Sequence, residues 1–191
     1  MGYFDTKKGI EEYIKRSEGW GGSKLINILK KYLPKKSTLL ELGMGPVRDF
    51  DILKKTYTST GSDGSKVFLD RYKRKDKNAD LLRLDVVSIP TEKRFDGIYS
   101  NKVLHHLTKK DLKKSIRRQK EVLNPEGIAF HSFWKGDKVE HKHGLLFVYY
   151  EMDKLEKIIG NNFDILQMKT FTEMDKDDAI YVVLKKISNL I

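Results

Sequence analysis

The sequence contains no cysteine. This excludes disulfide bonds, thiolate zinc sites and a cysteine nucleophile, and it suits the reducing cytoplasm, which is the location that we expect. No apolar run approaches the roughly 18 residues that would suggest a membrane span. The first residues, MGYFDTKKGIEEY, also lack the apolar core of a signal peptide. We therefore expect no membrane partner.

Arginine is scarce, since it supplies eight of the 38 basic residues and lysine supplies the rest. The net charge of +11 makes polyanions candidate partners. Proteins that read nucleic acid favour arginine for forked contacts, whereas the lysines here are spread along the chain, as in KKYLPKK and RYKRKDK. Their spread favours a solvated surface. A non-catalytic polyanion-binding protein remains an alternative.

Linkers rich in glycine, proline or serine are absent, and 191 residues fit one domain, so we expect a single domain over residues 1–191. Short apolar runs alternate with amphipathic segments, which predicts a parallel sheet covered on both faces. The expected strands are residues 38–42, 56–62, 79–84, 95–100 and 127–133. The expected helices between them are residues 47–55, 66–73 and 111–123.

The two ends of the chain have a different pattern. Residues 6–17 and 23–32 read as helices separated by EGWGGS. After a helix at residues 152–159, the segments 163–171 and 179–186 read as an antiparallel hairpin joined by TEMDKDD. The segment GDKVEHKHGL, before that helix, reads as a polar loop.

A glycine-rich turn follows the first expected strand, in TLLELGMGPVRDFDIL. Turns of the form G-x-G at this place bind nucleotide-like ligands. The third glycine of a dinucleotide fingerprint would fall at Arg48, where so long a side chain fits poorly. The turn therefore disfavours a nicotinamide oxidoreductase.

Further polar residues follow the next strands. Asp63 ends the second, Asp85 and Val86 follow the third, and Ser100 ends the fourth. The carboxyl ends of parallel strands share one edge of a sheet, which is where such sheets bind ligands. A carboxylate at Asp63 can accept hydrogen bonds from two ribose hydroxyls. A helix cap is the alternative explanation for that residue.

Together LLELGMGP, GSDGS, RLDVVSIP, FDGIYSNKVLHHL and EVLNPEGIAFHSF resemble the class I S-adenosylmethionine-dependent methyltransferases, and the last two resemble the small-molecule branch. The resemblance implies an α/β fold: a Rossmann-like seven-stranded mixed sheet, last strand antiparallel, with helices on both faces. Residues 37–191 would form this core and residues 1–36 an N-terminal helical lid. The family's third glycine falls at Val47 here.

The resemblance also implies S-adenosyl-L-methionine as cofactor. Glu41 would orient the methionine amino group, and Gly43 and Gly45 would let the backbone approach the cofactor. The remaining candidates are Asp63 with Gly64 for the ribose, Asp85 and Val86 for the adenine, Ser100 for the methionine end through its backbone, and Tyr13 in the lid. Tyr13, Trp20, Trp134, Tyr149 and Tyr150 are aromatic residues that could cover the cofactor or a substrate, or serve as packing anchors.

Methyl transfer from a sulfonium is an in-line displacement that depends mainly on orientation and needs no metal. A base is needed where the accepting atom carries a proton. His105 and His106 follow the fourth strand, and we choose His106 as the catalytic candidate, with local packing as the competing explanation. The H-x-H of His141 and His143 suits a solvated loop better than a metal site.

The expected acceptor is an unidentified small molecule, and the protein is expected to be a monomer or weak homodimer. The alternative is an RNA or other nucleic-acid methyltransferase. Its subclass that acts on exocyclic base nitrogens is disfavoured, because SNKV stands where that subclass carries an Asn/Asp-Pro-Pro-aromatic motif.

Overall fold

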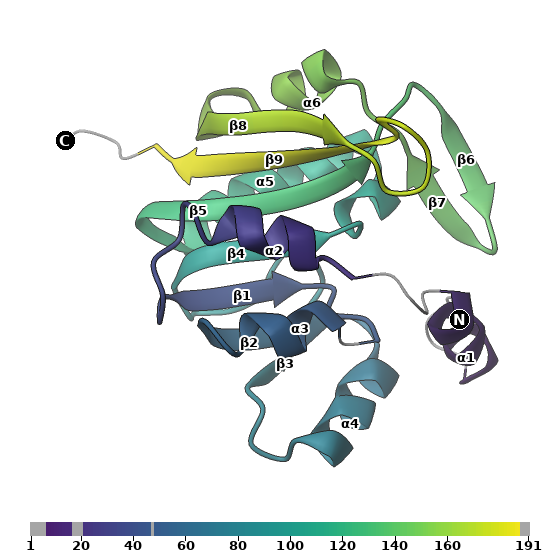
Figure 1. Cartoon of the computed structure of the whole chain (residues 1–191), viewed down its shortest axis with the longest axis vertical. Coiled ribbons are helices and arrows are strands. Elements are labelled where there is room, and N and C mark those ends of the chain that lie inside the picture. Colours follow the sequence, from purple (N-terminus) through teal and green to yellow (C-terminus); the bar gives the residue numbers. More distant parts are fainter. Residues whose placement is uncertain (1–6, 17–20, 47, 188–191) are drawn as a thin grey trace.

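The computed structural model describes residues 7–16, 21–46 and 48–187. Its centre is a seven-stranded sheet in the order β3-β2-β1-β4-β5-β9-β8 (Figure 1). These strands are β1 (Thr38–Leu42), β2 (Thr58–Asp63), β3 (Leu81–Arg83), β4 (Phe95–Asn101), β5 (Leu123–Trp134), β8 (Phe163–Phe171) and β9 (Ala179–Lys186). The first five pair in parallel, whereas β9 pairs antiparallel with both β5 and β8. The predicted mixed sheet with an antiparallel last strand is confirmed.

Helices cover both faces of this sheet, as predicted (Figure 1). The covering helices are α2 (Ser23–Leu29), α3 (Arg48–Leu53), α4 (Lys66–Lys75), α5 (Lys109–Val122) and α6 (Met152–Ile159), and a further helix, α1 (Lys7–Arg16), precedes them in the chain. Successive strand residues point to opposite faces, so Leu39 packs with α2 while Leu40 packs with α5 and α6. Each face of the sheet therefore packs against its helices through a separate apolar cluster. No helix in the described part of the chain is long and apolar enough to cross a membrane.

Several element ends differ from the prediction by two to four residues. α2 ends at Leu29 rather than residue 32, because Lys31 and Tyr32 donate to carbonyls three residues back, which tightens the last turn. α5 begins at Lys109 rather than residue 111, because Thr108 caps it: its Oγ1 accepts from Asp111 N at 3.1 Å. β5 begins at Leu123 rather than residue 127, with a bulge before Ile128.

The prediction of a polar loop at GDKVEHKHGL is wrong. This stretch contributes to a separate hairpin of β6 (Val139–Lys142) and β7 (Leu145–Val148). The two residues between these strands, His143 and Gly144, both have positive φ, 54° and 75°. Two such residues make the tight turn whose twist matches paired strands. Figure 1 shows this hairpin extending beyond the edge of the main sheet.

The lid at residues 1–36 and the single domain at residues 1–191 remain predictions. Of the lid, α1 and α2 are described, while Trp20 lies outside the described residues. α2 packs on the main sheet as part of the apolar core. α1 lies beside the carboxyl-end edge of the sheet (Figure 1).

Candidate active site

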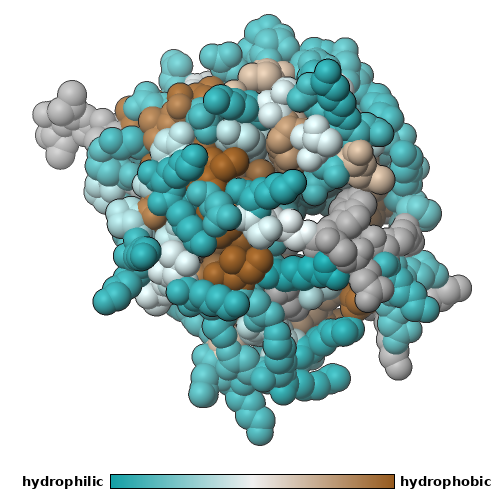
Figure 2. Space-filling model, viewed as in Figure 1, coloured by the Kyte–Doolittle hydropathy of each residue, from teal (hydrophilic) through white to brown (hydrophobic). Residues whose placement is uncertain are grey.

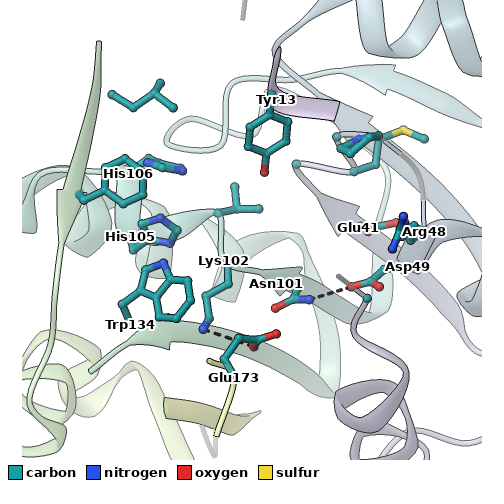
Figure 3. Close-up of a pocket in the computed structure, with 18 of the residues that line it drawn as sticks. Tyr13, Glu41, Arg48, Asp49, Asn101, Lys102, His105, His106, Trp134 and Glu173 are labelled. Atoms are coloured by element: carbon teal, nitrogen blue, oxygen red, sulfur yellow. Dashed lines mark hydrogen bonds and ion pairs between the residues drawn. The ribbon is translucent and has the colours of Figure 1, made fainter. Parts of the chain in front are cut away.

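A cavity of about 260 Å³ opens at the carboxyl ends of β1 and β4 (Figure 3). β1 pairs with β2 on one side and with β4 on the other, so the chain leaves these two ends in opposite directions. In open α/β sheets, ligands bind at such a switch point. The lining comes from the turn after β1, the start of α3, the residues after β4, the β6–β7 hairpin, Trp134, Tyr13 and Glu173.

The turn after β1 depends on its glycines. Gly43 has a φ of 70°, and a Cβ there would lie 2.6 Å from Cγ1 of Val103, so glycine alone fits. Gly45 has a φ of 49°, and its N–H donates to Oδ2 of Asp63 at 3.0 Å. Both glycines line the cavity, as expected of residues that let the backbone approach a ligand. Val47 lies outside the described residues.

Glu41, the fourth residue of β1, brings a carboxylate to the cavity floor. The side chain is 3% exposed, and its Oε2 has no hydrogen-bond partner among the described residues. Burial raises the pKa of Glu41 well above its usual value, and the negative charges of Asp49 and Asp63 raise it further. A cationic donor bound here would supply the missing partner.

Asp49, in the first turn of α3, joins three elements at the edge of the cavity. Its Oδ1 accepts from Gly22 N at 2.6 Å, and its Oδ2 accepts from Tyr99 Oη at 2.8 Å and from Asn101 Nδ2 at 3.0 Å. The last of these contacts is drawn in Figure 3. Sequence reasoning missed Asp49, because an acid in a first helical turn reads as an ordinary dipole or capping residue.

Asp63 holds the turn from β2. In addition to Gly45, it accepts from Ser65 N at 2.8 Å, a contact to the residue that precedes α4 rather than to an N–H of the helix itself. Burial raises its pKa, and the two backbone hydrogen bonds oppose that rise. Two oxygens with one partner each retain lone pairs for further donors. Asp63 and Gly64 lie on the predicted edge but do not line the cavity.

Asp85 and Val86 follow β3 on the same edge, also outside the cavity lining. Oδ1 of Asp85 accepts from Val87 N and Ser88 N, at 3.0 and 2.8 Å, and so fixes the turn after the strand. The Val86 carbonyl accepts from Ser115 Oγ at 2.6 Å. Leu84 N donates to the Asp63 carbonyl at 3.2 Å, which keeps this turn next to the end of β2.

Ser100 points away from the cavity. Its Oγ lies 2.8 Å from Nδ1 of His131 in β5, and both side chains are fully buried. Its neighbour Asn101 lines the cavity in its place. A backbone role for Ser100 remains a prediction.

His106 lies in the short helix η2 (Leu104–His106) and faces the hairpin. Its Nδ1 is 2.7 Å from the carbonyl oxygen of Leu146. Because a carbonyl only accepts, Nδ1 carries the hydrogen, and the neutral ring therefore has Nε2 as its proton acceptor. Burial lowers the pKa of His106, which keeps the ring neutral near pH 7. Its neighbour His105 is more deeply buried, and neither ring nitrogen has a partner among the described residues.

Lys102 completes the wall on the β4 side. Its backbone has a φ of 54°, a strained value that is held by its N–H donating to Ser132 Oγ at 3.0 Å. Its Nζ lies 3.5 Å from the centre of the Trp134 ring and 3.5 Å from Oε2 of Glu173. Burial lowers the pKa of Lys102 to about 8, against the opposing effect of Glu173. Nothing in the sequence distinguishes this lysine from the others.

Comparisons with known proteins agree with this geometry. Residues 40–131 match the family model described as a methyltransferase domain. No sequence relative is found among curated proteins.

Many solved structures share the fold, and three of them illustrate it. The first is a 1,6-didemethyltoxoflavin-N1-methyltransferase from Burkholderia thailandensis with S-adenosylhomocysteine, with a TM-score of 0.79 and 16% identity over 93% of this chain and 83% of that one. The second is the N-methyltransferase NodS from Bradyrhizobium japonicum with the same ligand, with a TM-score of 0.74 and 15% identity over 96% of this chain and 100% of that one. The third is the glycopeptide N-methyltransferase MtfA with S-adenosylmethionine, with a TM-score of 0.72 and 15% identity over 86% of this chain and 93% of that one. At these identities the likeness shows the fold.

The family match and the fold confirm the resemblance that the sequence motifs predict. Residues 40–131 therefore match the methyltransferase-domain family, and they lie within a described sheet that has the class I methyltransferase fold.

Proposed function

We propose that this protein transfers a methyl group from S-adenosyl-L-methionine to a small molecule. The observation that carries the proposal is the buried Oε2 of Glu41, which has no partner in the described part of the chain and lies beside the two-glycine turn, at the switch point of a class I methyltransferase fold. The three solved structures that share the fold support it, since they are N-methyltransferases that hold this cofactor or its product, and one also holds its small-molecule acceptor.

The residues present fit this cofactor. Glu41 would pair with the methionine ammonium, and Gly43 and Gly45 would let the backbone approach. Asp63 would hold the ribose, and the turn of Asp85 and Val86 would hold the adenine. Tyr13, whose side chain lies 3.9 Å from a Cβ placed on Gly45, would close the cavity from the N-terminal side.

The cofactor, when bound, supplies a methyl group activated by a positively charged sulfur. The chain's own contribution is to orient the acceptor, to exclude water and to manage a proton. Orientation of this kind can supply ~7–11 kcal/mol of the barrier reduction. Nε2 of His106 would take a proton from the acceptor, a role that the contact between Nδ1 and the Leu146 carbonyl supports because it favours the required tautomer.

The alternatives, a nucleic-acid methyltransferase and a non-catalytic polyanion-binding protein, rest on the charge of +11. Many lysines of the described chain are paired with nearby acids, such as Lys66 with Asp70 and Lys114 with Asp111. Hydrophilic side chains cover much of the face seen in Figure 2, with apolar patches between them. The pairing of lysines with acids favours a solvated surface over a binding surface for polyanions. Affinity for RNA that falls steeply with salt, without cofactor binding, would instead support the polyanion-binding alternative.

Calorimetry with S-adenosylmethionine and S-adenosylhomocysteine tests the proposal. We expect the wild-type protein to bind both ligands and Asp63→Ala to weaken binding at least about 10-fold, because it removes a charged acceptor and releases Gly45. Asp96→Ala is the matched control, since Asp96 also accepts from a backbone N–H, that of Thr38, at the opposite end of the sheet. A folded wild-type protein that binds neither ligand would overturn the proposal.

A further inference from the structure

The part of the cavity away from Glu41 is lined by aromatic rings and a buried lysine. The inference that it binds the methyl acceptor rests on the proposed function. We call this part the acceptor end; it is formed by Lys102, His105, His106, Trp134, Phe147 and Glu173. Figure 3 shows the labelled side chains of this group together, across the cavity from Glu41 and Asp49. They come from four separate parts of the fold: the β4–η2 segment, β5, the β6–β7 hairpin and the loop after β8.

Rings form much of the acceptor end. The His106 and Phe147 rings lie 4.7 Å apart at 79°, and the His105 and Phe147 rings lie 5.3 Å apart. The Trp134 ring faces Lys102. Flat ring surfaces of this kind pack best against another flat ring, because offset and edge-on aromatic contacts are both favourable.

The acceptor end holds a positive charge with unused donors. Nζ of Lys102 is buried and makes no hydrogen bond within the described chain, although Glu173 lies at ion-pair distance. The other titratable groups that act on this part of the site are Asp178, in the loop that carries Glu173, and His105 in η2. With a pKa of about 8, Lys102 is mostly charged at pH 7. His105, whose pKa is lowered well below the usual value by burial, is neutral.

A cation and a neutral base in one apolar pocket favour a substrate that loses a proton. We propose that the methyl acceptor is a flat aromatic or heteroaromatic molecule with an acidic O–H or N–H, ionised at the acceptor end by the charge of Lys102 and by proton transfer to Nε2 of His106. An aliphatic amine suits this end poorly, because it arrives as an ammonium ion beside Lys102, and the nearest carboxylate, Glu173, is already paired with that lysine.

The proposed transfer conserves atoms and electrons. The O–H or N–H bond of the acceptor breaks, and its proton passes to Nε2 of His106. The electron pair left on oxygen or nitrogen forms the new bond to the methyl carbon, while the carbon–sulfur bond breaks and its pair remains on sulfur. The products are the methylated acceptor and S-adenosylhomocysteine, and His106 returns its proton to water.

Chromogenic phenols test the proposal without turnover. 4-Nitrophenol and 7-hydroxycoumarin report their ionisation directly by absorbance, so they can be titrated with protein in the presence of S-adenosylhomocysteine. We expect the bound phenols to ionise about one pH unit below the free phenols, and their methyl ethers to bind at least about 10-fold more weakly at pH 7. Lys102→Met should abolish the shift and weaken phenol binding about 10-fold, whereas Lys102→Arg should retain part of both.

Lys138→Met is the matched control. Lys138 also lies over an aromatic ring, that of Tyr149 at 4.5 Å, and also pairs with a glutamate, but it does not line the cavity. It should leave both readouts unchanged. The inference is overturned if neither phenol binds, if binding leaves ionisation unchanged, or if Lys102→Met and Lys138→Met behave alike. Binding of S-adenosylhomocysteine in all variants, measured in parallel, separates these failures from failure of the proposed function.

Discussion

At the residue scale, the protonation state of Glu41 should depend on whether a cation is bound beside it. Burial and neighbouring acids raise its pKa, and a bound ammonium would lower it. Cofactor binding should therefore release a proton from Glu41 at any pH where Glu41 is protonated before binding. At low pH Glu41 is protonated and must lose this proton before it can pair with the ammonium. The affinity for S-adenosylhomocysteine should therefore fall as the pH is lowered through the raised pKa of Glu41.

Calorimetry in buffers of different ionisation enthalpy measures that proton release. Glu41→Gln should remove the release and flatten the pH dependence, while binding at high pH becomes at least about 10-fold weaker because a charged partner is lost. Identical proton release by the wild-type and Glu41→Gln proteins would contradict this assignment.

Single residues differed in how far the sequence could predict them. Gly43 and Gly45 were predictable because their spacing follows a buried strand, and the structure gives both a positive φ. Asp49 was not, because its partners lie 27, 50 and 52 residues away along the chain. The tautomer of His106 likewise depends on a carbonyl 40 residues away. Such roles come from tertiary contacts that local patterns do not record.

At the element scale, the β6–β7 hairpin was the principal error. Its signal was present, since HG followed by LLFV matches a two-residue turn before a strand, but charged residues in β6 concealed the pairing. The sheet strands were predicted more closely because buried strands are largely continuous apolar runs, as in the parallel strand β1 and the antiparallel strand β9. The outcome matters for function because the hairpin supplies Phe147 and the carbonyl that orients His106.

A substitution in the turn of the β6–β7 hairpin should therefore alter the candidate active site. Gly144 has a φ of 75°, and an added Cβ would meet no atom of the described residues within 4 Å. Gly144→Ala therefore strains the turn without a clash and should cost about 1 kcal/mol of unfolding free energy. Gly160→Ala is the control, because Gly160 has a φ of 55° and equally open surroundings but lies after α6, away from the cavity.

Nitrogen-15 NMR of the imidazoles distinguishes these two variants. Wild-type His106 should be found almost wholly as the Nδ1–H tautomer. Gly144→Ala should add the Nε2–H form as the Leu146 carbonyl moves, whereas Gly160→Ala should leave the tautomer unchanged although it costs at least as much stability, since Gly160 has a φ of 55° and a ψ of −148°. An unaltered tautomer in Gly144→Ala would show that the hairpin does not orient His106.

At the scale of the whole molecule, strand and helix alternation was enough to predict the class of sheet, and the motif resemblance implied its antiparallel last strand. What the sequence could not supply was the closure of the site, because it depends on how the hairpin, α1 and the β8–β9 loop pack around one edge. Folding also buries several titratable groups, so the stability of the protein should depend on pH.

The buried histidines make the folded protein sensitive to mild acid. His131 is fully buried beside Ser100, and burial lowers its pKa from 6.5 to about 3. Below pH 6.5 the unfolded chain binds a proton at this position and the folded chain does not, so stability falls with pH until about pH 3. Glu41 and Asp63 act in the opposite direction, since their raised pKa values favour the folded state as pH falls.

A variant isolates the histidine contribution from these acids. Between pH 7.5 and 5.5, the wild-type protein should lose about 1 kcal/mol more unfolding free energy than His131→Gln, as measured by urea denaturation at both pH values. Comparing the change with pH removes the variant's own loss of packing. His141→Gln, at an exposed position in β6, should follow the wild-type dependence. Equal slopes for His131→Gln and wild type would mean that His131 is protonated as readily in the folded chain as in the unfolded one.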